Sequence, residues 1–134
     1  MPANNQTSLF DHSLEPRLDR VFAPMCNAVP LAQVKLLKGE VANHMQAIWQ
    51  ALRQNEFLDV TLAERIATVL LRLLGEYGEH TVSNQSLIIG ATRYFIKDHD
   101  AESDLSSLLG FDDDVRVLNY VLESIGKNDL RIDL

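Results

Sequence analysis

The spacing of apolar residues between positions 30 and 54 is the feature that most constrains this chain. Apolar side chains recur there at steps of three or four residues, at Leu31, Val34, Leu37, Val41, Met45, Ile48 and Leu52. That period places them on one face of an α-helix, and Pro30 suits a helix start. The pattern predicts a long amphipathic helix over about 30–54, with Gly39 as its weakest point. Trp49 lies beside Ile48 on this stripe, so we expect it in the core.

Two further helices are predicted before position 80. Apolar residues between Pro16 and Pro24 predict a short helix that ends before the second proline. Thr61 and Glu64 have the spacing of a capping box, which predicts a helix that starts at Leu62. Because its residues up to Gly75 are apolar almost all round, we expect this helix to be central and the most buried.

The last two helices flank an acidic segment. Ser83 or Asn84 is suited to cap a helix that ends near Lys97. Residues 115–125 repeat the helical period, Gly126 is suited to end that helix, and Lys127 complements its negative end. Strand-type alternation and hairpin turns are absent from the sequence. The predicted fold is all-α: a compact bundle of four main helices plus a short N-terminal helix.

Length and composition fit one folded unit. The 134 residues, 46% of them hydrophobic and 23% charged, can bury one core. We expect a flexible N-terminal tail at 1–12 and a single helical domain at 13–134. The polar N-terminus lacks the pattern of a signal peptide, and no apolar run is long enough to cross a bilayer.

Cys26 and the four histidines give no sign of a reactive or metal site. A lone cysteine cannot form an internal disulfide, which favours a reducing, cytoplasmic location and an inert thiol. His12, His44, His80 and His99 have no zinc-type spacing. Phosphate-binding loops, nucleophile elbows and dinucleotide fingerprints are also missing. We therefore assign no catalytic residue and expect a protein that is not an enzyme.

The negative charge of the chain is concentrated in residues 98–114. This segment has no Lys or Arg and accounts for the whole net charge of −7, through Asp98, Asp100, Glu102, Asp104, Asp112, Asp113 and Asp114. Such a field repels phosphate backbones, and the basic residues are scattered along the sequence. We expect no nucleic-acid partner.

The same region carries a family resemblance. A helix with an aromatic residue near its end leads through spaced acidic residues to a Leu-Gly-aromatic group and an Asp pair, at Tyr94, Ile96, Asp100, Asp104, Leu109, Gly110, Phe111, Asp113, Asp114, Val117 and Leu118. In this spacing the segment resembles the YkvA-like bacterial domains of unknown function. It differs where that family carries prolines, at Asp98, Ser103 and Ser107. The resemblance implies a helical fold and brings no established activity.

The carboxylates of this segment have two interpretations. Asp100, Asp104, Asp113 and Asp114 could together bind Mg²⁺, Mn²⁺ or Ca²⁺, because a cation relieves their mutual repulsion. An EF-hand is excluded on spacing, since Ser103 and Leu109 stand where its glycine and glutamate belong. The alternative is structural: carboxylates at the start of a helix cap free N–H groups and complement the helix dipole.

These observations favour a non-enzymatic cytoplasmic interaction module with an acidic loop. Asp98, Glu102 and Asp112 are the expected interaction surface. The partner is expected to be another protein or a second copy of the chain. A second copy would bury the extra apolar positions of the long helix, Leu36 beside Leu37 and Trp49 beside Ile48. The alternative is a divalent-cation-binding domain, regulatory or hydrolytic, that uses the carboxylates of 98–114.

Overall fold

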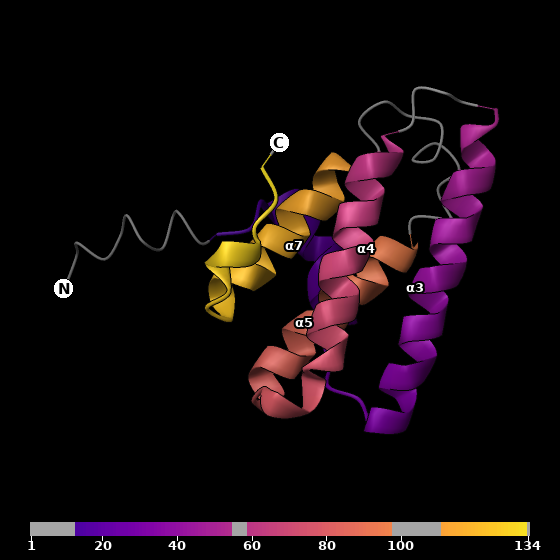
Figure 1. Ribbon diagram of the computed structural model, residues 1–134. Coiled ribbons are helices and arrows are strands. Elements are labelled where there is room, and N and C mark those ends of the chain that lie inside the picture. Colours follow the sequence, from indigo (N-terminus) through magenta and orange to yellow (C-terminus); the bar gives the residue numbers. More distant parts are fainter. Residues whose placement is uncertain (1–12, 55–58, 98–110, 134) are drawn as a thin grey trace.

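All regular structure among the described residues is helical (Figure 1). The computed structural model describes residues 13–54, 59–97 and 111–133. The main helices are α3 (Leu31–Leu52), α4 (Val60–Gly75), α5 (Val82–Lys97) and α7 (Asp112–Ser124), and α2 (Pro16–Phe22) precedes them. The described residues also contain three short 3₁₀ helices: η1 (Ala23–Met25) after α2, η2 (Tyr77–Glu79) between α4 and α5, and η4 (Asn128–Leu130) after α7. The predicted bundle of four main helices and a short leading one is confirmed.

The centre of the bundle is α5, and the prediction that the 62–75 helix is central was wrong. Helix α5 contacts α2, η1, α3, α4 and α7, and Figure 1 shows it crossing behind α4. Five consecutive α5 residues are buried, Ile88–Thr92. In α4 only one face is buried, and Leu71 on the other side is exposed. Small residues within α5 let neighbours pack on several sides, which an apolar composition alone does not reveal.

The N-terminal caps of three helices differ from the predicted ones. Asp59 accepts a hydrogen bond from the Leu62 amide at 3.0 Å, so α4 begins at Val60 and the capping box is not formed. Thr81 accepts from the amide of Asn84 at 3.2 Å, one position outside α5. The N-cap of α7 is Phe111 without a side-chain cap, although three aspartates lie in its first turn and complement the dipole.

The C-terminus of α7 follows the prediction. Gly126 has φ of +80°, the left-handed conformation that glycine adopts without strain. The amide of Lys127 donates to the carbonyl of Leu122 at 2.7 Å, and Gly126 donates to Glu123 at 3.3 Å. These two bonds are the Schellman pattern. Helix α3 continues without interruption through Gly39.

Two side chains fix the irregular segment between η1 and α3. The hydroxyl of Tyr77 accepts from the Val29 amide at 2.7 Å and donates to the Val29 carbonyl at 2.8 Å. Arg93 of α5 donates to the carbonyl of Met25 at 3.0 Å. These bonds satisfy backbone groups that no helix pairs.

Among the described helices, none is both long and apolar enough to cross a membrane.

Candidate functional site

The acidic residues at the start of α7 have separate surroundings. Asp114 is 3% exposed, whereas Asp112 and Asp113 are half-buried. Successive residues of an α-helix point about 100° apart, so the three carboxylates are not aimed at one point. The other predicted site residues, Asp98, Asp100, Glu102 and Asp104, lie outside the described residues.

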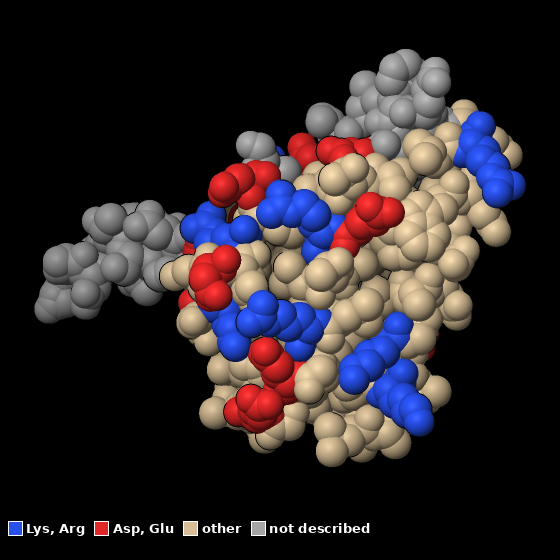
Figure 2. Space-filling view, in the orientation of Figure 1, with Lys and Arg blue, Asp and Glu red and all other residues tan. Residues whose placement is uncertain are grey.

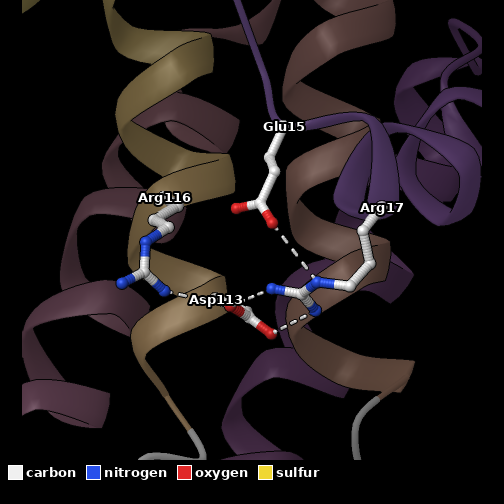
Figure 3. A network of polar contacts seen from close by, with 4 residues as sticks. All are labelled: Glu15, Arg17, Asp113 and Arg116. Atoms are coloured by element: carbon white, nitrogen blue, oxygen red, sulfur yellow. Dashed lines mark hydrogen bonds and ion pairs between the residues drawn. The ribbon is translucent and has the colours of Figure 1, made fainter.

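Asp113 belongs to a network that joins α2 to α7 (Figure 3). Arg17 donates to both of its oxygens, at 3.2 and 3.3 Å, and Arg116 donates to Oδ1 at 3.0 Å. Glu15 accepts from Nε of Arg17 at 3.4 Å. The hydrogen bonds from Arg17 to Asp113 raise the pKa of this arginine above its ordinary value. A cation bound at Asp113 would meet two guanidinium groups, so the geometry favours a structural role for this carboxylate.

No other carboxylate group in the described chain offers a clearer metal site. Within residues 13–54, 59–97 and 111–133, no three His, Cys, Asp or Glu side chains are grouped so as to hold a metal ion. Glu76 and His80 lie close, with 3.9 Å between Oε1 and Nε2, although α4 ends before them. Lys127 lies 3.1 Å from the same Glu76 oxygen, and its hydrogen bond lowers the pKa of the Glu76 carboxyl. A metal ion there would be repelled by the ammonium group.

A polar hollow of about 420 Å³ lies along α7, between the residues that precede α2 and the C-terminal segment. Asn119 fixes its C-terminal wall, because its amide binds both the N–H and the carbonyl of Ile132, at 2.9 and 2.8 Å. Arg131 and Glu123 form an ion pair of 2.6 Å in the same wall. The arginines of this hollow are thus already paired with carboxylates of the chain.

Trp49 is on the surface, and the expectation that it lies in the core was wrong. Its side chain is 41% exposed, although its neighbour Ile48 is completely buried. The indole Nε1 donates a hydrogen bond of 2.9 Å to Oε2 of Glu64 on α4. Because Asp59 is the N-cap of α4 in place of Thr61, Glu64 does not take part in a capping box and its carboxylate accepts from Trp49 instead. The result is an exposed tryptophan with a fixed indole.

We name the exposed surface of α3 and α4 that carries Trp49 the docking face: its other members are Lys35, Lys38 and Arg53 from the α3 side, with Glu64, Arg65 and Leu71 from α4. Steps of three and four residues place the α3 members on one stripe, and Leu71 lies two turns after Glu64. Leu71 is 37% exposed. A shallow hollow of about 240 Å³ adjoins Glu64, lined by Thr61, Glu64, Arg65, Thr68 and Val69. Figure 2 shows this side of the molecule, with basic side chains at both ends of α3.

The sequence pattern did not identify this face. Its apolar members are few and separated in the chain, and the helical period alone assigned Trp49 to the core. The one signal for it was the width of the apolar stripe on α3, where Ile48 and Trp49 are neighbours.

Comparison with known protein families, curated proteins and solved structures finds no match to this chain. The resemblance of residues 94–118 to the YkvA-like domains therefore stays a prediction.

Proposed function

We propose that this chain is a non-enzymatic protein-interaction module that binds a protein partner on the docking face. The observation that carries the proposal is the exposed Trp49, held by Glu64 at the junction of α3 and α4. Tryptophan and arginine are the residues most enriched among the energetic anchors of protein interfaces. The docking face presents both, together with an exposed leucine and an adjacent hollow.

The fixed position of the indole supports binding. A side chain that is immobilised only on association costs about 0.5–1.5 kcal/mol in lost rotamer freedom. The hydrogen bond to Glu64 already restricts Trp49 before a partner arrives, so less of this cost falls on binding. The hydrophobic core lies directly beneath the docking face, because Met45 and Ile48 of α3 and Ala67 and Leu70 of α4 are buried.

The electrostatics of the α7 hollow support recognition over catalysis. The arginines that line it, Arg116 and Arg131, are already paired with Asp113 and Glu123 of the same chain, so neither is left to hold an anionic substrate. We also infer a cytoplasmic location, because Cys26 is a free thiol, as is usual in a reducing compartment. Burial raises the pKa of this thiol to about 11.

The proposal is tested with the fluorescence of Trp49, the chain's one tryptophan. The partner is first captured with the wild-type protein, Trp49→Ala and Leu36→Ala. Leu36 is the matched control, since it is a large apolar residue of α3 that is 65% exposed on another side of the helix. A captured protein is then purified and added to the wild-type chain.

We expect capture to be lost with Trp49→Ala and retained with Leu36→Ala. The purified partner should shift the Trp49 emission to shorter wavelength and protect it from acrylamide, because docking removes the indole from water. Thermal melts establish that both variants are folded. The proposal is wrong if no partner depends on Trp49, or if the bound state leaves its emission unchanged.

A further inference from the structure

Five of the basic side chains of this protein are held in ion pairs: Arg17, Arg72, Arg116, Lys127 and Arg131. The four cations of the docking face, Lys35, Lys38, Arg53 and Arg65, are exposed and form no ion pair with any described residue. Arg20, Arg93 and Lys97, which belong to α2 and α5, form none with a described residue either. Four of the cations without an ion pair therefore share one face with Trp49, toward the two ends of α3 and on α4.

This local charge is opposite in sign to that of the whole chain. The net charge is −7, yet the residues that define the docking face include four exposed cations and one carboxylate, Glu64. Interfaces place opposite potentials against each other, and unpaired rim charges accelerate association with a partner of the other sign. The rim thus selects for an acidic partner.

The centre of the face distinguishes a protein from a nucleic acid. Glu64 lies beside the indole and lines the adjacent hollow, where a phosphate would meet its negative charge. Trp49 is 41% exposed beside Glu64, and Leu71 is exposed two turns further along α4, so the face offers apolar contact that suits an aliphatic side chain. A partner that fits this face needs carboxylates to meet the cations of the rim and an apolar side chain to meet the centre. An amphipathic acidic segment supplies both.

We propose that the docking face binds an acidic amphipathic segment of a partner protein. Carboxylates of the segment pair with Lys38 and Arg53 toward the two ends of α3, and one of its apolar side chains packs on Trp49 between them. This inference rests on the proposed function, because it names the partner chemistry of the same face.

The test uses a synthetic amphipathic peptide of leucine and glutamate, with Trp49 emission as the readout. The control peptide has lysine at every glutamate position, and a DNA duplex is a third ligand. We expect the Leu/Glu peptide alone to shift the emission, with an affinity that falls as salt rises.

Charge reversal on the docking face is the second test. The double variant Lys38→Glu with Arg53→Glu should weaken binding of the Leu/Glu peptide about tenfold or more. Arg20→Glu is the matched control on α2, because it reverses an exposed charge elsewhere, and should leave the affinity unchanged.

Other outcomes overturn the inference. Equal binding of both peptides, no binding of the Leu/Glu peptide, or a stronger response to DNA each refutes an acidic protein segment. Sedimentation that shows a dimer, dissolved by the Lys38/Arg53 variant, would make a second copy the occupant instead. If a captured partner still depends on Trp49 while these charge tests fail, only the acidic chemistry is wrong and docking stands.

Discussion

Gly90→Ala is expected to destabilise the protein, although alanine is the better helix former. Gly90 lies in the middle of α5, where α2 and η1 pack against it. A Cβ atom there would lie 2.3 Å from Sγ of Cys26 and 2.8 Å from Cε1 of Phe22. Real Cβ atoms do not approach other atoms so closely, so either the short helix or the central helix must shift.

The magnitude follows from two opposed terms. Alanine in place of glycine inside a helix gains about 1 kcal/mol. Overpacking of a well-filled core costs about 1–3 kcal/mol, and more when the neighbour cannot move. Phe22 is 2% exposed and its ring packs edge-on against Tyr120, so it has little room to yield. We expect a net loss of about 2 kcal/mol in the free energy of unfolding.

Gly39→Ala is the matched control, because it makes the same substitution in the interior of α3. A Cβ at Gly39 would have no neighbour within 4 Å. It should therefore raise the free energy of unfolding by up to about 1 kcal/mol. Urea titrations of the wild type and both variants measure these changes, with the slope as a check on two-state behaviour.

A third variant locates the clash. Cys26→Ala removes the atom nearest to the added methyl group, so in that background Gly90→Ala should cost less than in the wild type. If Gly90→Ala stabilises the protein as Gly39→Ala does, the close packing of α2 and η1 on α5 is wrong.

Three further predictions concern the segments around the bundle. Tyr77→Phe should lower the free energy of unfolding by about 1–3 kcal/mol, because both backbone groups of Val29 lose their partner; an unchanged urea midpoint contradicts this. Asn119→Ala should release the C-terminal segment, seen as faster hydrogen exchange of the Ile132 amide, whereas continued protection would refute the anchor. Burial raises the pKa of Cys26 from 9.0 to about 11, so the unfolded chain loses the thiol proton first and the folded state loses stability as pH rises through that range. Urea titrations at about pH 8 and 10.5 should show a smaller alkaline loss in Cys26→Ala than in the wild type.

The helices themselves were predictable from local signals. The three-and-four spacing of Val34, Leu37 and Val41 is a property of neighbouring residues, and all three are buried in α3 as expected. Gly126 ends α7 because only glycine adopts its left-handed backbone without strain. Such signals depend on a few consecutive residues, which the sequence contains in full.

The assignments that failed depended on contacts between distant segments. Trp49 and Ile48 are adjacent and both apolar, but only the position of α4 decides which of them it covers. Arg17 and Asp113 are 96 residues apart, so no local pattern could show that this carboxylate is already paired. Glu64 has the spacing of a capping-box residue. Asp59 is the N-cap of α4 instead, and Glu64 accepts a hydrogen bond from the indole of Trp49.

The position of α5 separates the stability of this protein from its proposed binding. Phe22 and Cys26 approach α5 at Gly90, on the side of α2 and η1. Trp49 and Leu71 lie on the exposed surface of the α3–α4 pair, whose inner residues alone contribute to the core. Two sites with no shared contact have nearly additive effects on stability. Substitutions at Gly90 should therefore change unfolding while the folded docking face keeps its affinity, and Trp49→Ala should abolish binding at little cost to the core.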